Sequence, residues 1–467
     1  MGNISTYDSY VFNNYFGIDL PEHWDEKRLG YLASNDKNAF VDGPFGSDLK
    51  TNDYKEDGIP LIQLNNIRDG KHILRNFKYV TEQKKNELSR HIARPRDIVL
   101  AKMAEPVARS AIVSEQFDEY VIVADCVKMT PDSQKIDLNF LNWAINSEVV
   151  KTQAELVSTG TTRIRISLGE LKKLKVPYPS HDEQTKIANF LDHETAKIDT
   201  LIEKQQQLIK LLKEKRQAVI SHAVTKGLNP QAPMKNSGVE WLGEVPEHWD
   251  VSRIKYLSSI ISKGTTPSTI GGDFVTEGVR FLKAENIGKS TSVKPFPEFF
   301  ISEKVDTQLS RSRLKENDVL VIIAGATTGL ASIVQKDVLP ANTNQAVSFI
   351  RPANPKLSYW IVNWLTTEFV QSTIWMGAVQ AAQPNLSMED LGNIPIVVPP
   401  ESELVLIQES LKGKLATLDN LMIKAESAIS IMQERRTALI SAAVTGKIDV
   451  RNWQAPTSQN QALEQTA

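Results

Sequence analysis

The decisive stretch of the sequence is LPEHWD, residues 20–25, which returns as VPEHWD at residues 245–250. A second stretch, EKRQAVIS at residues 214–221, returns as ERRTALIS at residues 434–441. From Ile166 and Leu386 to Thr225 and Thr445 the two copies stay 220 residues apart without a gap. A chain of 467 residues is too long for one compact core. The repeat therefore predicts two similar halves.

Each half is expected to begin as a mixed α/β globule. Short β-branched runs bounded by Gly, Pro, Asn and Asp recur at residues 58–67 and 278–287, and at residues 97–100 and 318–321. Such runs are typical of strands. A helix should follow in each copy, from about residue 138 to 156 and from about residue 357 to 375. The expected fold class is α/β with mixed α+β content.

Each half is expected to end in a long helix. Prolines precede the helices at residues 177, 179, 399 and 400, and Gly227 and Gly446 follow them. Apolar residues recur at heptad spacing at Leu191, Ile198, Leu201, Leu208, Leu212 and Val219, and again at Leu411, Leu418, Leu421, Met432 and Leu439. Ile202, Ile209, Met422 and Ile429 widen the stripe. Matching stripes predict that the helices, each roughly 60 Å long, form an antiparallel coiled coil with pseudo-twofold symmetry. The alternative is that each helix packs only onto its own globule.

These patterns divide the chain into five parts. The first globule spans residues 1–180 and the first long helix residues 181–227. A linker and the second globule span residues 228–400, and the second long helix spans residues 401–446. The remaining residues, 447–467, are expected to form a disordered tail.

Composition excludes several classes of protein. The single cysteine, Cys126, excludes internal disulfides and a thiolate zinc cluster, and it suits a reducing cytoplasm. No apolar run approaches the roughly 20 residues that span a bilayer. The net charge of −2 argues mildly against a nucleic-acid binder. Phosphate binding, however, needs only a local cationic surface.

Motifs for catalysis are not found. The sequence has no Asn-Pro-Pro-aromatic methyltransferase motif, and Gly288-Lys289-Ser290 is no phosphate-binding loop because Lys283 stands where that motif needs glycine. The seven histidines show no metal-ligand spacing. His23 and His248 stand beside Trp24 and Trp249, which indicates a turn with a buried tryptophan rather than a zinc or catalytic site. No catalytic residue, metal or cofactor is therefore expected in this chain.

Several segments resemble the specificity subunits of type I restriction-modification systems. The most specific are SGVEWLGEVPEHW at residues 237–249 and the block from residue 158 to 227. GPFGSDLK at residues 43–50, followed by IQLNNI at residues 62–67, is similar to the opening of a target recognition domain in that family.

The resemblance implies two target recognition domains, each reading one half of a split double-stranded DNA sequence. It implies that two long helices set the spacing of the halves and dock two modification subunits. Adenine methylation with S-adenosylmethionine, and cleavage driven by ATP with Mg²⁺, would then belong to the modification and restriction (motor-nuclease) subunits. The second copy departs from the first, with QAAQPN at residues 380–385 where the first has GTTRIR at residues 160–165. Contacts to the DNA backbone expected of the first half are therefore not carried over to the second.

Candidate DNA-binding residues are cationic, amide and hydroxyl side chains suited to phosphates or base edges. In the first half they are Ser47, Lys50, Gln63, Asn65, Arg68, Lys71, Lys102, Arg109, Arg163 and Arg165. In the second half they are Lys263, Thr265, Thr266, Lys283, Asn286, Thr327, Thr328, Asn344 and Gln345. Among them Arg163 and Arg165 are expected to contact phosphates. A basic run over residues 71–96 is a further candidate, with an ordinary solvated face as the alternative.

Two other functions stay open from the sequence. One is a DNA-modifying enzyme with an unrecognised cofactor site, which binding of S-adenosylmethionine by the isolated chain would favour. The other is a duplicated coiled-coil adaptor that binds only proteins, which loss of all DNA affinity in the assembled complex would favour.

Overall fold

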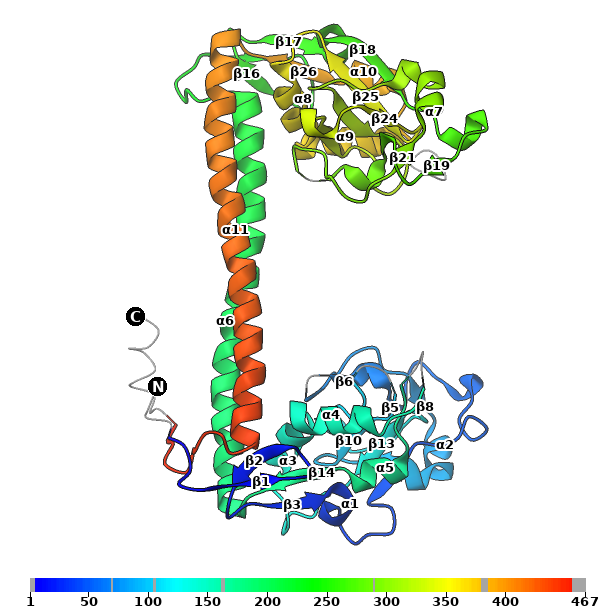
Figure 1. Ribbon diagram of the computed structural model, residues 1–467, viewed down its shortest axis with the longest axis vertical. Coiled ribbons are helices and arrows are strands. Elements are labelled where there is room, and N and C mark those ends of the chain that lie inside the picture. The colour runs from blue at the N-terminus through cyan, green and yellow to red at the C-terminus, as the bar shows by residue number, and fades with distance from the viewer. Residues whose placement is uncertain are drawn as a thin grey trace. The chain divides into compact units, whose positions relative to one another are not determined.

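The computed structural model describes residues 5–68, 70–103, 106–160, 164–288, 290–378 and 385–455. The chain forms two compact units: unit 1 is residues 1–205 with 427–467, and unit 2 is residues 206–426. Each unit thus takes one globule together with part of each long helix (Figure 1).

Unit 1 is built on two four-stranded sheets. One is antiparallel with the order β11-β10-β13-β4, and the other has the order β8-β5-β12-β9, in which β5 and β12 are parallel. Their strands are β4 (Phe40–Asp42), β5 (Ile59–Ile62), β8 (Tyr79–Val80), β9 (Ile92–Ala93), β10 (Ile98–Ala101), β11 (Ser110–Ile112), β12 (Tyr120–Ile122) and β13 (Cys126–Met129). Two-stranded pairs join β1 (Tyr10–Asn13) to β2 (Ile18–Pro21), β3 (Asp25–Arg28) to β14 (Lys175–Tyr178), and β6 (Ile67–Arg68) to β7 (Lys71–His72). The helices are α1 (Leu29–Leu32), α2 (Glu82–Glu87), α3 (Leu138–Ile145), α4 (Glu148–Leu156) and α5 (Leu168–Lys173).

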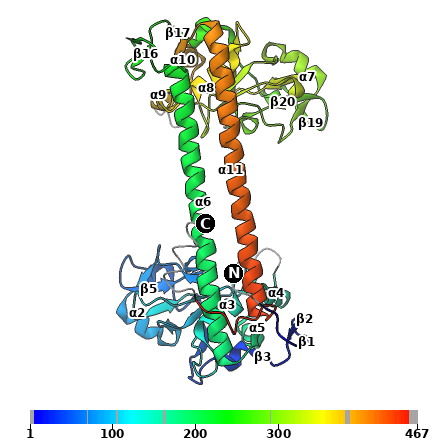
Figure 2. The same cartoon turned by 90° about the vertical axis from the view of Figure 1, so that its left-hand side faces the viewer.

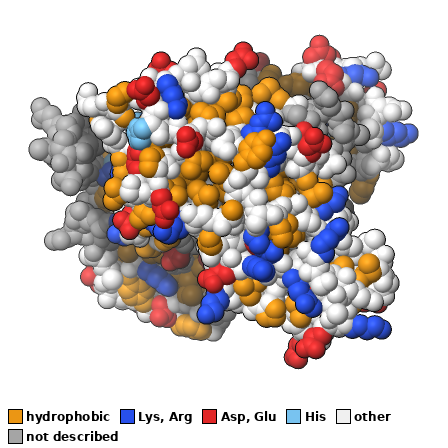
Figure 3. All heavy atoms as spheres, turned by 90° about the horizontal axis from the view of Figure 1, so that it is seen from above, with side chains coloured by type: hydrophobic (Ala, Val, Ile, Leu, Met, Phe, Trp, Pro, Cys, Tyr) orange, Lys and Arg blue, Asp and Glu red, His pale blue; other side chains and the backbone are white. Residues whose placement is uncertain are grey.

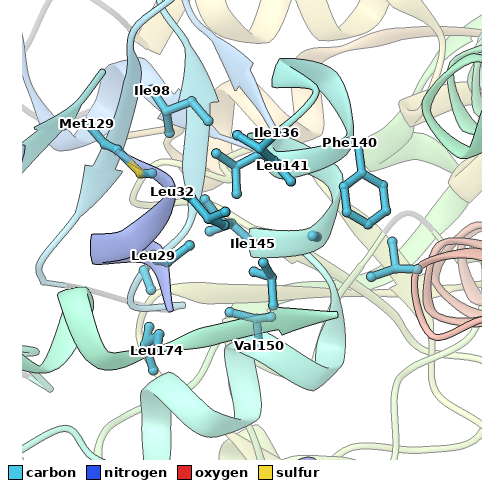
Figure 4. Close-up of a cluster of buried hydrophobic side chains, with 14 of the residues drawn as sticks. Leu29, Leu32, Ile98, Met129, Ile136, Phe140, Leu141, Ile145, Val150 and Leu174 are labelled. Carbon is cyan, nitrogen blue, oxygen red and sulfur yellow. The ribbon is translucent and has the colours of Figure 1, made fainter. Parts of the chain in front are cut away.

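The core of unit 1 lies between α3 and the sheet that contains β10. Ile98 and Met129 from the sheet meet Leu141 of α3 and Leu32 of α1 (Figure 4). The same buried cluster includes Leu191 and other residues of the long helices. The globule and the helix ends therefore share one core.

Unit 2 repeats the first sheet and the three strands β8, β5 and β12 of the second, whereas its fourth strand, β19, joins the opposite edge from β9. Its sheets have the orders β18-β25-β22-β23 and β19-β21-β20-β24, and β20 is parallel to β24 as β5 is to β12. The strands are β18 (Ser258–Lys263), β19 (Phe274–Val275), β20 (Val279–Leu282), β21 (Phe300–Ile301), β22 (Val319–Ile322), β23 (Ala331–Ile333), β24 (Ala341–Thr343) and β25 (Val347–Pro352), with pairs β15 (Met234–Asn236) to β16 (Glu244–Pro246) and β17 (Asp250–Arg253) to β26 (Pro395–Val398). The helices are α7 (Glu303–Gln308), α8 (Leu357–Leu365), α9 (Glu368–Ala378) and α10 (Met388–Asn393). The predicted duplication of a mixed α/β globule is confirmed.

The helix expected in each globule is broken into two, so that part of the prediction is wrong. In unit 1 the break lies at Asn146, whose amide donates to the carbonyls of Asn142 and Ser110. In unit 2 the hydroxyls of Thr366 and Thr367 donate to carbonyls one turn back. Side chains that bond to the backbone in this way compete with continuation of the helix.

The long helices α6 (His181–Lys226) and α11 (Glu401–Val444) pack together, as predicted (Figures 1 and 2). In unit 1 Arg436 Nε lies 2.9 Å from Asp199 Oδ1, and in unit 2 Arg216 Nε lies 3.1 Å from Asp419 Oδ1. Each pair joins an early residue of one helix to a late residue of the other, so the helices are antiparallel. The two pairs are each other's copies at 220 residues, so the same contact between the helices recurs in both units.

The buried seam between the helices differs from a strict heptad pattern. Ile198, Leu212 and Leu418 are buried as expected, but Leu201, Leu208 and Leu421 are 48%, 42% and 44% exposed. Ile209, which was expected to widen the stripe, is buried. An α-helix has 3.6 residues per turn, so a heptad position drifts about 20° per repeat unless the helices supercoil enough to compensate. Prediction of a full stripe was therefore wrong at these three leucines.

The repeated His-Trp pair fastens each globule to the start of a long helix. In unit 1 Glu183 accepts from His23 (3.1 Å) and from the indole of Trp24 (3.3 Å). In unit 2 Glu403 accepts from His248 (2.7 Å) and from the indole of Trp249 (3.1 Å). Both indoles are buried, which confirms the predicted turn with a buried tryptophan.

Electrostatics support this anchor in unit 1. Burial raises the pKa of the Glu183 carboxyl, but hydrogen bonds and attraction from His23, with further hydrogen bonds from Ser180 and Trp24, outweigh burial and hold that pKa below its usual value. The carboxyl is therefore ionised at neutral pH and acts as an acceptor for all three partners.

Residues after α11 pack onto the first residues of the chain and onto α6 within unit 1. The amide of Asp449 donates to Ser5 O at 2.7 Å, and Trp453 lies edge-on to Phe190 with 5.5 Å between ring centroids. Gly446 has a φ of +69°, and a β-carbon there would lie 2.4 Å from Pro21. Residues 456–467 of the predicted tail lie outside the described residues.

Two leucines one turn apart on α11 test the seam. Replacing the buried Leu418 with Ala should destabilise the protein by about 2–5 kcal/mol, because a cavity replaces packed atoms. The matched change Leu421→Ala should cost about 1 kcal/mol or less, because that side chain is 44% exposed. Urea unfolding of both variants measures the difference. Equal losses would contradict the assigned seam.

Candidate nucleic-acid interface

Three loops of unit 1 enclose a pocket of about 440 Å³ beside the ends of β5 and β12. It is lined by Pro44, Gly46, Leu49, Tyr54, Gln63, Leu64, Asn65, Val123, Ala124 and Asp125. Gly43 lets two of the loops approach, because a β-carbon there would lie 2.0 Å from Val123 O. Only glycine fits such contact between backbones.

Unit 2 repeats this arrangement of three loops, which we call the loop frame. Its loops follow β4, β5 and β12 in unit 1 and β18, β20 and β24 in unit 2. A β-carbon on Gly264 would lie 1.8 Å from Thr343 O. The three-residue loop 344–346 joins β24 to β25 as residues 123–125 join β12 to β13. Its closing hydrogen bond, Val347 N to Asn344 O at 3.2 Å, matches Cys126 N to Val123 O at 2.9 Å.

A buried asparagine shapes the loop after β5 and the loop after β20. Asn66 Oδ1 accepts from Gln63 N, and its amide donates to two carbonyls of residues 73 and 75. Asn286 Oδ1 accepts from Lys283 N at the same 3.0 Å, and its amide donates to Lys294 O and Pro297 O. Buried polar groups are normally satisfied in this way. Asn286, a predicted DNA-binding residue, thus bonds within its own loop.

Four of the predicted residues in unit 1 lie at this frame. Gln63 and Asn65 line the pocket, and Ser47 and Lys50 are exposed in the loop that borders it. Gln63 and Asn65 correspond to Lys283 and Glu285 of unit 2. The loop frame is therefore shared, whereas the side chains at its edge, which we call the rim, differ between the two units.

Two further predicted residues lie beyond the end of β10 and form ion pairs. Lys102 Nζ lies 3.2 Å from Asp42 Oδ2, and Arg165 forms an ion pair with Asp125. The Lys102 side chain is mostly buried, and that of Arg165 is half exposed. Arg163 lies outside the described residues.

The remaining predicted residues of unit 1 lie elsewhere. Arg68 and Lys71 are exposed on the β6–β7 pair, and Lys71 Nζ lies 3.4 Å from Asp199 of α6. Arg109 is buried and donates to the carbonyls of Ile67 and Leu64. Its guanidinium therefore supports the loop after β5 from within.

In unit 2, Lys263 ends β18, and Thr265 and Thr266 follow it beside the loop that carries Gln345. The backbone amide of Thr266 donates to Gln345 Oε1 at 3.1 Å. The side-chain oxygen of Asn344 is buried and has no hydrogen-bond partner among the described residues. Polar side chains thus cluster at the same place in the frame as in unit 1.

Three other predicted residues of unit 2 are placed differently from one another. Lys283 Nζ lies 3.4 Å from the centroid of the Phe299 ring. Thr327 is exposed in the turn after β22, whereas Thr328 is buried and donates to Gly325 O at 2.8 Å.

The basic run of residues 71–96 is largely balanced by acidic partners. Lys78, Lys84, Lys85 and Arg94 form ion pairs with carboxylates. Figure 3 shows a different face, that of unit 2, on which basic side chains are also interspersed with acidic and hydrophobic ones. These ion pairs favour the ordinary solvated face over a broad cationic surface for this run.

Acidic residues at the frame were missed by the sequence analysis. Asp42 and Asp125 lie beside Lys102 and Arg165, but an acidic side chain is not an expected partner for a polyanion. Only their positions could have pointed to them. Asp42 ends β4 and Asp125 directly precedes β13, and both strands have counterparts in unit 2.

Among the described residues, no group of three or more His, Cys, Asp or Glu side chains is arranged to hold a metal ion. Burial raises the pKa of the Cys126 thiol to about 12, so it is protonated at neutral pH. In the described part of the chain no helix is long and apolar enough to cross a membrane.

Comparison with known proteins identifies the family. The sequence model of the type I restriction modification DNA specificity domain matches twice, at residues 21–211 and 246–431. The type I restriction enzyme MjaVIII specificity subunit of Methanocaldococcus jannaschii is 22% identical, with 96% of this chain and 98% of that protein covered. The EcoKI specificity subunit of Escherichia coli K12 is 22% identical, covering 86% and 85%.

A solved structure has the same fold. It comes from work on complex assembly and conformational transition of the type I R-M system, and it matches with a TM-score of 0.70 at 16% identity over 91% of this chain and 99% of that one. The double match of the domain model covers most of the sequence, in the two globules that the structure duplicates. The chain therefore belongs to the specificity subunits of type I restriction-modification systems, a non-catalytic family without catalytic cofactor sites whose members recognise DNA targets.

Proposed function

We propose that each globule reads one half of a bipartite double-stranded DNA target and that the paired helices set the distance between the halves. The observation that carries this proposal is the repeated loop frame with a different rim in each unit. Gly43 and Gly264 hold the same backbone arrangement, while Gln63 and Asn65 are replaced by Lys283 and Glu285. Two sites with one geometry and different side chains are suited to reading two different sequences.

Contacts to DNA would then come from the frame and its neighbours in each globule. Exposed groups such as Lys50 and Lys263 would bind phosphates, and amide groups such as those of Asn65 and Gln345 would meet base edges. The domain limits follow the sequence pattern, with reading domains at residues 1–180 and 228–400.

Exchange of one globule tests this division. Replacing residues 20–160 with the equivalent segment of a relative should change one half of the methylated motif, because the other globule keeps its own rim. The matched exchange of residues 245–380 should change the other half. Single-molecule sequencing of modified genomic DNA reads both motifs. A change in both halves after either exchange would rule out independent reading.

We further propose that the helix pair docks two modification subunits. Apolar side chains stay exposed on both helices, at Leu201 and Ile431 in unit 1 and at Leu211 and Leu421 in unit 2. The members of each set are copies of the other at 220 residues, which supports two equivalent docking faces. Exposed apolar patches of this kind are typical of protein interfaces.

The catalytic groups would then be supplied by the assembled partners. The modification subunits would use S-adenosylmethionine to methylate adenine, and restriction subunits would add cleavage driven by ATP with Mg²⁺. We place this complex in the cytoplasm, which suits the single buried Cys126.

Stoichiometry tests the docking faces. Native mass spectrometry of the purified complex should find two modification subunits per chain. Glutamate at both Leu201 and Ile431 should leave one, because a charge at an apolar contact must be desolvated. Leu156→Glu is the matched control, since that leucine is 74% exposed but belongs to α4 and not to a long helix, and two subunits should remain. One or four subunits in the unaltered complex would refute the proposal.

A further inference from the structure

Asp125 and Arg165 form an ion pair whose place in the site is fixed by the backbone around it. Asp125 lines the 440 Å³ pocket, and the two side chains are 31% and 48% exposed. The hydrogen bond runs from Nη2 of Arg165 to Oδ1 of Asp125. A guanidinium has five N–H donors in a planar fork. Among the described residues Asp125 is the one partner of this guanidinium, so the second N–H of Nη2, together with the N–H of Nε or Nη1 beside it, is left as a two-donor fork for a ligand.

Lys102 ties both residues to the end of β10. Its amide donates to Asp125 O at 2.8 Å, and its carbonyl accepts from Ile166 N at 2.9 Å. The backbone of Arg165 makes two further hydrogen bonds with Thr159, each of 2.9 Å. The next residue, Ile166, is fully buried and anchors this segment of backbone to the core. The ion pair therefore sits on a rigid base.

Unit 2 keeps this base and replaces both charges. Ile323 takes the place of Lys102, since its amide donates to Ala346 O at 2.9 Å and its carbonyl accepts from Leu386 N at 2.8 Å. Ala346 therefore corresponds to Asp125, and Asn385 corresponds to Arg165. The carboxylate is absent from the copy that lacks the guanidinium. Since the frame survives without the ion pair, the pair is not needed to build the frame.

The charges around Arg165 favour a neutral ligand over a phosphate. Asp125 already balances the guanidinium, and the neighbouring Lys102 is balanced by Asp42. A phosphate at Arg165 would also lie close to the Asp125 carboxylate and be repelled by it. The edge of a base pair carries no net charge and offers both acceptors and donors.

We propose that the Asp125–Arg165 pair reads one G·C base pair in the half-site of the first domain. Arg165 would donate to O6 and N7 of guanine, and Asp125 would accept from the N4 amino group of the paired cytosine. In the second domain Asn385 presents an amide at the corresponding place, a group suited to N6 and N7 of adenine. This assignment rests on the proposed function and revises the phosphate contact expected of Arg165 from the sequence.

Arg165→Ala in the complete methylating complex tests the assignment. One G·C position in the first half of the methylated motif should lose its preference by on the order of 5- to 150-fold, the range of a bidentate base contact. The second half should stay unchanged, as should the dependence of binding on salt. Asn385→Ala is the matched control and should relax a position in the second half only.

A second variant, Arg165→Gln, keeps a polar side chain and gives a readout that a merely structural residue would not. The same position should shift from G·C toward A·T, because a glutamine amide pairs with adenine. Asp125→Ala should weaken discrimination at that position and no other.

Several results would overturn the assignment. One is an intact motif in the Arg165→Ala variant with a salt slope lower by about one unit, which marks a phosphate contact. Another is relaxation at an A·T position. If the unaltered complex methylates no bipartite motif, the proposed function itself fails. If the unaltered complex methylates a bipartite motif and that motif is unchanged in the Arg165→Ala, Arg165→Gln and Asp125→Ala variants, only the reading by Arg165 and Asp125 is refuted.

Discussion

The buried seam between α6 and α11 ties each globule to both long helices. Ile198, Leu212 and Leu418 supply its apolar contacts, and the pairs Asp199–Arg436 and Asp419–Arg216 select the register. Partly exposed ion pairs add little stability, so the apolar seam holds the helices together and the charges specify how they align. Because the two ion pairs are copies of each other, one set of interactions orders the helices in both units.

In each globule the backbone of the loop frame is the same, whereas the side chains of its rim differ. Gly43 and Gly264 permit the same close approach of backbones, and Asn66 and Asn286 satisfy the same loop from within. These residues bond to backbone atoms, so they fix geometry without selecting a sequence. The rim between them differs between the two copies. A duplicated chain thus keeps one frame and carries a different set of side chains on it in each copy, as the proposed reading of two half-sites requires.

Much of this fold could be predicted from the sequence because the repeat and the apolar stripes are local patterns. Prolines, glycines and heptads placed both long helices to within two residues. The break at Asn146 could not be predicted in this way, because its amide bonds to Ser110, far away in the sequence. Asp125 was missed for the same reason. The role proposed for Asp125 depends on its ion pair with Arg165, which is 40 residues away in the sequence. A carboxylate considered alone is not expected at a DNA-binding site, because DNA is a polyanion.

The unread spacer between the two half-sites tests most directly whether the paired helices set the distance at which the domains read DNA. Inserting seven residues after Gln205 and after Ala425 lengthens both helices by about 10 Å. That equals roughly three base pairs at about 3.4 Å each. The methylated motif of a strain carrying both insertions should keep its half-sites and gain a longer spacer. An active complex that methylates the original spacer would contradict a ruler made of α6 and α11.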